Sequence, residues 1–194
     1  MKLELKRRIK IQEKEIKRLR YELEYWKRKA SLDYMTGVLN KCEGMKRLQE
    51  DMNNCFVSKE KLTIAFIDID QLKSINDSLG HCEGDKLLKD VAKILKENIR
   101  KEDYIFRFGG DEFVVVFYRA AEEEVKEIWD RILRGILCYN ERESLIFPMS
   151  LSTGFYEYKK EMNSNPEAFI KMADSKMYTE KKIKRQNFKK IVEK

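Results

Sequence analysis

The sequence YIFRFGGDEFVVVFY at residues 104–118 contains two apolar runs separated by a pair of glycines. Both runs are rich in the β-branched and aromatic residues that favour strands. Gly109 and Gly110 give the chain the backbone freedom that a tight turn needs. The stretch therefore predicts a β-hairpin whose turn carries two acidic residues, Asp111 and Glu112.

A second acidic pair ends an apolar run earlier in the chain. Leu62–Ile69 (LTIAFIDI) is typical of a buried strand, and side-chain alternation places Asp68 and Asp70 on the same face. Carboxylates that leave a buried strand are costly unless they are paired, hydrogen-bonded or bound to a metal. If this strand lies beside the hairpin, Asp111 comes close to Asp68.

Together these carboxylates favour a site for a metal and a nucleotide. Oxygen ligands without histidine or thiolate partners suit Mg²⁺, which keeps several waters and also binds substrate phosphates. Gly109 and Gly110 would let a phosphate approach the backbone, because no Cβ blocks the way. Aspartate and glycine also occur in plain turns, so either acidic pair alone would favour that simpler interpretation.

The segment Lys73–Asp85 (KSINDSLGHCEGD) is predicted to be a loop, and two of its residues have side chains that could read a guanine edge. Asn76 offers a donor and an acceptor, and Asp85 can accept hydrogen bonds from the ring N–H and the amine of guanine. The alternatives are a turn role for Asn76 and a first-turn helix position for Asp85, where the helix dipole favours an acid. Taken alone, His81 is more often a structural residue than a catalyst.

Apolar periodicity predicts the remaining elements and the fold class. Asn40 with Glu43 resembles a capping box at a helix start. The predicted helices span 41–56, 84–100, 121–137 and 168–184, and the predicted strands span 62–69, 104–108, 112–118 and 145–156. In the predicted helix at 121–137, apolar spacing predicts that Leu133 is among the residues that face inward. This order predicts an α+β fold, with helices packed on a largely antiparallel sheet.

Residues 2–30 carry a heptad repeat without proline or glycine. The a positions are Lys2, Ile9, Ile16, Leu23 and Ala30, and the d positions are Leu5, Gln12, Leu19 and Trp26. Isoleucine at a and leucine at d favour a parallel two-stranded coiled coil. We therefore predict a stalk helix about 44 Å long that pairs two copies of the chain.

Charges beside the apolar seam support the parallel arrangement. In a parallel dimer, each g residue faces the following e residue of the other copy. Three such pairs are opposite in sign: Arg8–Glu13, Glu15–Arg20 and Glu22–Lys27. A basic leucine zipper is the rival interpretation. In that design a basic block precedes the zipper, whereas here the charges are interleaved with the apolar positions.

Composition excludes several classes of protein. Residues 1–29 hold 12 basic and 5 acidic residues. Their net charge of +7 equals the net charge of all 194 residues. A basic stripe can bind nucleic acid or an acidic membrane, but we favour a solvated helix face and expect no nucleic-acid partner. No apolar run approaches the roughly 20 residues of a membrane span. Four cysteines without CxxC spacing and one histidine argue against a zinc site and suit a reducing cytoplasm.

Five segments, in order over about residues 31–187, resemble the GGDEF family of diguanylate cyclases. RFGGDEF at 107–113 is the signature of that family. DYMTGVLNK at 33–41 is similar to the opening D-x-L-T-G-L-x-N-R. Two of the five segments lie within residues 68–85 and are similar to D-I-D-x-F-K-x-I-N-D-x-x-G-H-x-x-G-D. The fifth, residues 173–185, is similar to the last helix of the family.

The resemblance implies a palm-like nucleotide-cyclase fold at 32–190, preceded by the coiled-coil stalk at 1–31. It implies condensation of two GTP into cyclic di-GMP and two pyrophosphates by a homodimer, with Mg²⁺, or Mn²⁺ in its place, as cofactor. Leu72 replaces the usual phenylalanine, and Lys184-Arg185-Gln186 replaces G-R-N. These departures lie at the guanine pocket and the last helix and touch no metal ligand.

The resemblance also implies roles for individual residues. The implied metal ligands are Asp68, the Ile69 carbonyl, Asp111 and, as an assisting group, Glu112. The implied catalytic residues are Asp111 as proton acceptor, Glu112 and Lys73. The implied substrate contacts are Asn76, His81 and Asp85 at the guanine, and Gly109, Gly110, Lys73, Lys181 and Arg185 around the triphosphate.

An R-x-x-D string, Arg100 to Asp103, stands at the offset from the signature where the family has its inhibitory site. A guanidinium can fork onto a phosphate or a guanine edge, and a carboxylate can accept from guanine N–H groups. Arg131, on the facing helix, is a candidate second contact. The plainer interpretation is a helix C-terminus followed by a turn. We expect cyclic di-GMP to bind here and to inhibit without competing with GTP.

Two other classes of function compete with catalysis. A GGDEF domain that has lost catalysis can sense GTP or cyclic di-GMP, but such domains usually lose signature residues, and none is lost here. A coiled-coil scaffold explains the stalk but not the carboxylates. Residues 1–30 contain no sensor fold, so the input signal is expected to come from a partner protein or from a sensor outside this sequence.

Overall fold

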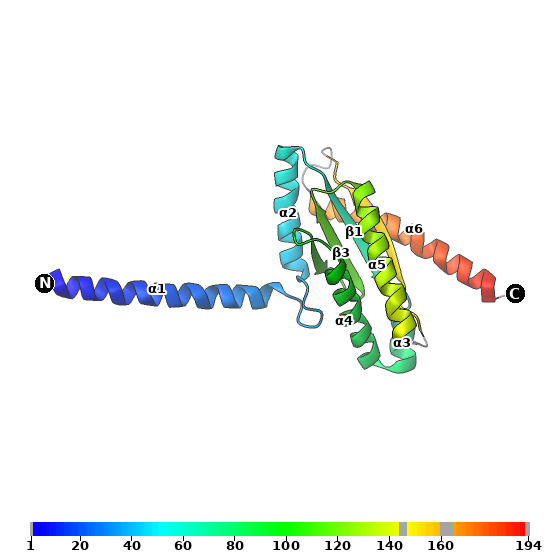
Figure 1. The fold of residues 1–194 in the computed structure, drawn as a ribbon, viewed down its shortest axis with the longest axis horizontal. Helices are drawn as coiled ribbons and strands as arrows, with labels where there is room; N and C mark the ends of the chain where they lie inside the picture. Colours follow the sequence, from blue (N-terminus) through cyan, green and yellow to red (C-terminus); the bar gives the residue numbers. More distant parts are fainter. Residues whose placement is uncertain (1, 144–146, 160–164, 193–194) are drawn as a thin grey trace. The chain divides into compact units, whose positions relative to one another are not determined.

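The computed structural model describes residues 2–143, 147–159 and 165–192, and the chain divides into two compact units, Met1–Leu32 and Asp33–Lys194. In the first unit, helix α1 spans Lys2–Ser31, as the heptad repeat predicts (Figure 1). Its described large apolar side chains at a and d positions are exposed: Ile9, Ile16, Leu19, Leu23 and Trp26. Within the described ranges, no helix combines the length and apolarity needed to cross a membrane.

The second unit is built on one antiparallel sheet with the strand order β2-β3-β1-β4. The strands are β1 (Leu62–Ile69), β2 (Tyr104–Arg107), β3 (Glu112–Tyr118) and β4 (Leu151–Glu157). The predicted hairpin and the predicted buried strand are confirmed, and they lie side by side. The strand predicted at 145–156 begins only at Leu151, and residues 144–146 lie outside the described ranges.

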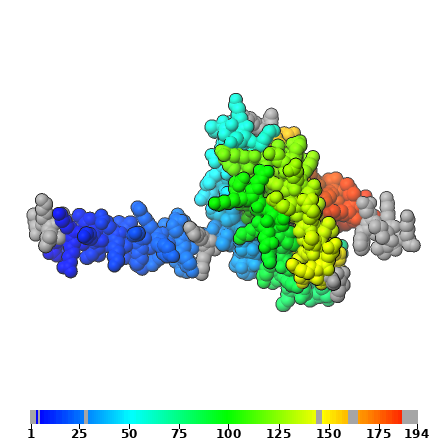
Figure 2. Space-filling model, viewed as in Figure 1, coloured from blue at the N-terminus to red at the C-terminus, as the bar shows by residue number. Residues whose placement is uncertain are grey.

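Helices cover both faces of this sheet, which confirms the α+β prediction (Figure 1). Helices α4 (His81–Asn98) and α5 (Glu122–Glu143) cover one face. Helices α2 (Lys41–Ser58) and α6 (Pro166–Val192) cover the other. Figure 2 shows this unit in the same view, with the yellow-green atoms of the α5 region on the side turned to the viewer. At the start of α2, the Asn40 side chain accepts from the Glu43 N–H at 3.0 Å, as the capping box predicts.

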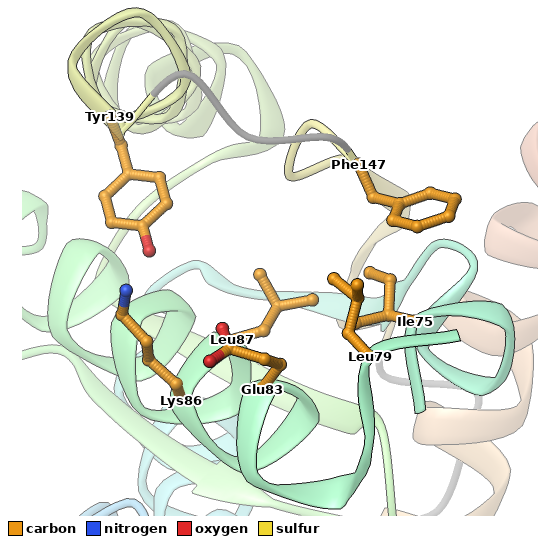
Figure 3. A pocket seen from close by; sticks show the side chains of 7 residues that line it. All are labelled: Ile75, Leu79, Glu83, Lys86, Leu87, Tyr139 and Phe147. Atoms are coloured by element: carbon orange, nitrogen blue, oxygen red, sulfur yellow. The ribbon is translucent and has the colours of Figure 1, made fainter. Parts of the chain in front are cut away.

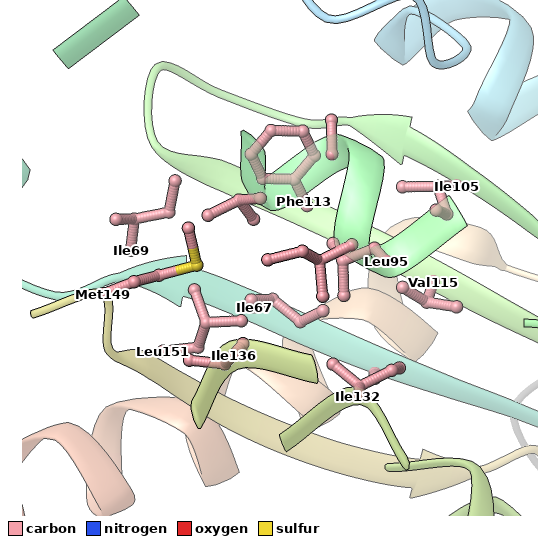
Figure 4. Packing of buried hydrophobic residues seen from close by; sticks show 14 of the residues in the cluster. Ile67, Ile69, Leu95, Ile105, Phe113, Val115, Ile132, Ile136, Met149 and Leu151 are labelled. Carbon is pink, nitrogen blue, oxygen red and sulfur yellow. The ribbon is translucent and has the colours of Figure 1, made fainter. Parts of the chain in front are cut away.

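Side-chain alternation along β1 separates two hydrophobic cores. Ile67 and Ile69 join the core under α4 and α5, where they pack with Phe113 (Figure 4). Ile64 joins the core under α2 and α6. The prediction that Leu133 faces inward is wrong, because the buried stripe of α5 passes through Ile132 and Ile136 and leaves Leu133 39% exposed.

The prediction of a loop over 73–85 is also wrong. Helix α3 spans Leu72–Leu79, and α4 follows after Gly80, whose φ is 88°. The chain can reverse directly after β1 because Gln71 adopts the left-handed conformation, with a φ of 62°. Leu72 and Ile75 then pack into the core. A helix of eight residues with two buried positions leaves little periodicity for a sequence to reveal.

Gly154 allows α6 to lie directly on β4. A Cβ at this position would clash with the backbone of Ala173 and Met177. The close approach lets α6 run past the end of β1 and carry its lysines to the acidic residues there.

Candidate active site at the acidic end of the sheet

The predicted metal ligands meet at one end of the sheet. Asp68 is opposite Glu112 across the β1–β3 pair, and the Ile69 N–H donates to the Asp111 carbonyl at 3.1 Å. Burial raises the pKa of Asp68, and the charges of Asp111 and Asp70 add to this effect. Burial likewise raises the pKa of Glu112, followed by the charges of Asp111 and Asp68. A bound cation would relieve this repulsion.

The chemistry of the donors fits Mg²⁺ or Mn²⁺. Asp68, Asp111 and Glu112 offer carboxylate oxygens, and Ile69 offers a carbonyl. In the part of the chain that the structure describes, no three His, Cys, Asp or Glu side chains form a metal-binding group by themselves. Mg²⁺ is usually held by one or two carboxylates together with substrate phosphates and waters. The site therefore fits a metal that shares its ligands with a nucleotide.

The turn of the hairpin is held by contacts that sequence reasoning missed. Arg107 donates to the carbonyls of Gly109 and Gly110 at 3.2 and 2.6 Å. Its guanidinium also pairs with Asp33 at 3.2 Å. A Cβ at Gly109 would clash with the Glu112 carboxylate, whereas a Cβ at Gly110 would meet open space. The turn therefore stays accessible at Gly110, where a phosphate can approach.

Of the predicted triphosphate contacts, the structure brings Lys181 to the acidic residues. Its ammonium donates to Asp68 Oδ1, and the pair is largely shielded from solvent. Arg185 lies further along α6 and is exposed, as is Lys73 on α3. The roles of Arg185 and Lys73 stay predictions.

Two further charged residues act on the Glu112 carboxylate. The Lys41 ammonium lies 3.7 Å from the centroid of the Phe108 ring. Beside the dominant effect of burial, the charge of Asp174 raises the pKa of Glu112 and that of Lys41 lowers it. Sequence reasoning did not assign a role to either residue. Both belong to segments that match the family pattern, and that match is the signal that could have identified them.

The predicted base-reading residues lie on two packed helices. Asn76 is on α3 and Asp85 is on α4, and both are half-buried. Among the described residues, buried Asn76 Oδ1 has no hydrogen-bond partner. An unpaired buried amide oxygen is costly, and this one packs against Gly84, where a Cβ would clash with it. His81 is exposed at the first position of α4.

Replacing Gly84 with alanine is expected to weaken GTP binding. The new Cβ would clash with the Asn76 side-chain amide, so the amide must turn away or α3 must separate from α4. We expect KM for GTP to rise roughly tenfold or more, with a smaller change in kcat, in steady-state assays. Thermal denaturation checks that the variant is folded. An unchanged KM in a folded variant would exclude Asn76 from the guanine contacts.

The predicted inhibitory residues surround the turn between α4 and β2. The buried Asp103 carboxylate accepts from the N–H groups of Arg100 at 3.0 Å and Tyr118 at 3.2 Å, which is the turn role of the plainer interpretation. Arg131 Nε donates to the Asn98 carbonyl at 3.0 Å. The guanidinium of Arg131 therefore contacts the last residue of α4, Asn98, which is two positions before the exposed Arg100.

A separate shallow pocket lies between α3, α4 and α5 (Figure 3). Its lining residues are Ile75, Leu79, Glu83, Lys86, Leu87, Tyr139 and Phe147. The Tyr139 hydroxyl donates to Asp90 at 2.6 Å. This lining includes none of the predicted site residues.

Known proteins resemble this chain along most of its length. The family profile described as diguanylate cyclase, GGDEF domain, matches residues 30–187. Diguanylate cyclase DgcP of Pseudomonas aeruginosa is 32% identical over 182 residues, which cover 93% of this chain and 27% of DgcP. Diguanylate cyclase DosC of Escherichia coli is 29% identical over 157 residues, which cover 78% of this chain and 33% of DosC. The chain thus spans a third or less of these relatives.

Solved structures confirm the fold. The coiled coil and GGDEF domain of DgcB from Caulobacter crescentus, in complex with c-di-GMP, matches with a TM-score of 0.77 and 25% identity. That match covers 92% of this chain and 94% of the DgcB chain. SiaD of Pseudomonas aeruginosa, solved with its activator SiaC, matches with a TM-score of 0.75 and 20% identity, and covers 92% of this chain and 68% of the SiaD chain.

Proposed function

The chain belongs to the GGDEF family, and we propose that it is a diguanylate cyclase that condenses two GTP into cyclic di-GMP and two pyrophosphates. The observation that carries this proposal is the meeting of Asp68, Asp111 and Glu112 at one end of the sheet, with Lys181 beside them. The purified chain is expected to form cyclic di-GMP from GTP and Mg²⁺. A chain that bound either nucleotide without turnover would be a sensor instead.

The acidic end of the sheet would hold the metal and accept the proton. Asp68, the Ile69 carbonyl and Asp111 are the proposed ligands, with Glu112 assisting. When held there, Mg²⁺ or Mn²⁺ would supply two effects: a lower pKa of the attacking 3′-hydroxyl and neutralisation of the charge that develops at the α-phosphate. Asp111 accepts the proton of that hydroxyl as general base.

Basic side chains and glycines would bind the rest of the triphosphate. Lys181 and Arg185 reach it from α6, and Lys73 reaches it from α3. Their charges offset those of the phosphates, and Lys73 steadies the reacting α-phosphate. The turn at Gly109 and Gly110 leaves the backbone accessible to the same group.

The pair of helices α3 and α4 would select guanine. Guanine presents a ring N–H and an amine, and both Asn76 Oδ1 and the Asp85 carboxylate can accept from such donors. The Asn76 amide lies against Gly84, which precedes Asp85 in α4, and this proximity supports the assignment because one base could contact both side chains. His81 lies at the edge of the same helix pair.

Two domains must face each other, because each would hold one GTP. We assign residues 1–31 to a parallel coiled-coil stalk and 32–190 to the cyclase domain. The exposed apolar stripe of α1 supports a second copy as its partner. Glu15 and Glu22 pair with Arg18 inside one helix, at 2.7 and 2.8 Å. In the dimer, these two glutamates would also face basic e positions of the second copy. We propose that a partner protein or a further sensor acts through this stalk.

Replacing Arg100 with alanine is expected to relieve inhibition by cyclic di-GMP. The exposed guanidinium is the proposed contact with a product phosphate or guanine edge, with Arg131 as the second contact. Arg100 is preferred over Asp103 as the test, because the Asp103 carboxylate also holds the turn. We expect the inhibition constant to rise about tenfold or more, measured from initial rates at several GTP concentrations.

Lys101→Ala is the matched control, since it removes an adjacent exposed charge. Asp103 contacts Tyr118 at the end of β3 opposite to Glu112, so the site lies away from the proposed metal ligands and excess GTP should not relieve the inhibition. Equal inhibition constants in wild type and Arg100→Ala would refute the assignment, as would full relief by GTP.

A further inference from the structure

Helix α6 carries a lysine where the family pattern G-R-N has glycine, at position 184. The Lys184 ammonium donates to the Leu151 carbonyl, pairs with Glu180 at 2.8 Å and lies 3.7 Å from Asp70 Oδ2. These contacts connect α6 to the end of β1 and to the start of β4. A glycine at this position could make none of them.

The Asp70 side chain, at one end of this connection, is held in place by hydrogen bonds. Its carboxylate accepts from the hydroxyls of Ser150 and Ser152 at 2.6 and 2.7 Å, and its N–H donates to the Ser150 carbonyl at 2.9 Å. Two short hydrogen bonds hold the carboxylate against β4 and away from the role of a free metal ligand. Asp70 therefore serves as an anchor for Lys184, whereas Asp68 faces Lys181.

Glu180 fastens the same part of α6 to the sheet. Its Oε2 accepts from the Thr153 N–H at 2.8 Å, while its Oε1 pairs with Lys184. Glu180 and Lys184 are one turn apart, so they form an ion pair along the helix that also reaches two points of β4.

Polar contacts matter here because apolar ones end earlier on α6. The last buried apolar side chain of the helix, among those that the structure describes, is Met177. Beyond it, Tyr178 and Ile183 are 54% and 53% exposed. The stretch that carries Lys181 and Arg185 therefore depends on polar connections to the sheet.

We propose that Lys184 is a positioning residue that holds this stretch of α6 so that Lys181 and Arg185 can bind one triphosphate together. The inference rests on the proposed function, because it takes these two residues as phosphate contacts. Lys184 acts through α6, by fixing the helix relative to β1 and β4. It is itself not required to touch the nucleotide.

The test compares Lys184→Met, which keeps the side-chain stem, with Lys184→Arg, which keeps the charge. Lys171→Met is the matched control, since Lys171 is exposed on an earlier turn of α6. Affinities for pyrophosphate, for guanosine and for a GTP analogue that cannot react at its α-phosphate are measured with Mg²⁺ present, by displacement of a fluorescent derivative of that analogue. Thermal midpoints and steady-state constants for GTP are measured on the same proteins.

Lys184→Met is expected to weaken GTP and pyrophosphate binding about tenfold and to raise KM for GTP by a similar factor. Guanosine affinity and the thermal midpoint should stay near wild type, and Lys184→Arg should recover most of the loss. Unchanged GTP affinity, or equal losses for GTP and guanosine, would overturn the proposal. Binding is measured without turnover, so a wild-type chain that bound GTP but made no cyclic di-GMP would refute the proposed function separately.

Discussion

Replacing Asp111 with asparagine is expected to abolish cyclic di-GMP synthesis and to leave the fold intact. The substitution removes a proposed metal ligand and the proposed proton acceptor, so kcat should fall about a thousandfold or more. The fold should persist because Asp111 supports the sheet through its backbone carbonyl, which accepts from the Ile69 N–H. Initial rates of product formation and circular dichroism measure the two effects.

Asp130→Asn is the matched control for this substitution, since Asp130 is an exposed acid on α5. It makes the same chemical change on α5, which covers the face of the sheet opposite to α6, and should leave the rate near wild type. Near-normal turnover in Asp111→Asn would remove Asp111 from both of its proposed roles.

Deleting residues 1–29 is expected to make the protein mainly monomeric and to lower its specific activity at low concentration. A stalk dimer holds two domains at a high effective concentration. Without it, domains meet by collision. At nanomolar protein we expect a loss of about a hundredfold or more, with partial recovery as the concentration rises. Analytical ultracentrifugation and rate measurements over a concentration series test both statements.

Point variants distinguish loss of the seam from loss of the whole helix. Ile16→Asp places a charge in the apolar seam, whereas Lys17→Asp changes the neighbouring residue outside it. Only the former should dissociate the dimer. A truncated protein that stayed dimeric and fully active at nanomolar concentration would show that the stalk is not the organiser.

The sequence predicted those parts of the fold whose signals are local. The hairpin around Gly109 and Gly110 and the buried strand β1 were confirmed, because strand composition and turn glycines lie next to each other in the chain. The capping box at Asn40 and the long helix α1 were confirmed for the same reason. The acidic end of the sheet followed from placing two such local predictions side by side.

The missed features depend on tertiary contacts. Helix α3 was missed because its start is set by the left-handed conformation of Gln71. Glutamine is not a residue type that indicates this conformation. The tie between Lys184 and Asp70 joins residues 114 positions apart only after α6 packs on β4. Arg107 likewise finds Asp33 across 74 positions. The spacing of two residues along the sequence gives no distance between them in space. These contacts could therefore be identified only from the folded structure.

The most direct test of the account is the product balance of the reaction. The purified chain is incubated with GTP and Mg²⁺, and cyclic di-GMP and pyrophosphate are quantified together over time. The account predicts one cyclic di-GMP and two pyrophosphates for every two GTP consumed, with both products absent in Asp111→Asn. Intact GTP at the end of the incubation, or its conversion to GDP and phosphate, would contradict the proposal that this chain is a diguanylate cyclase.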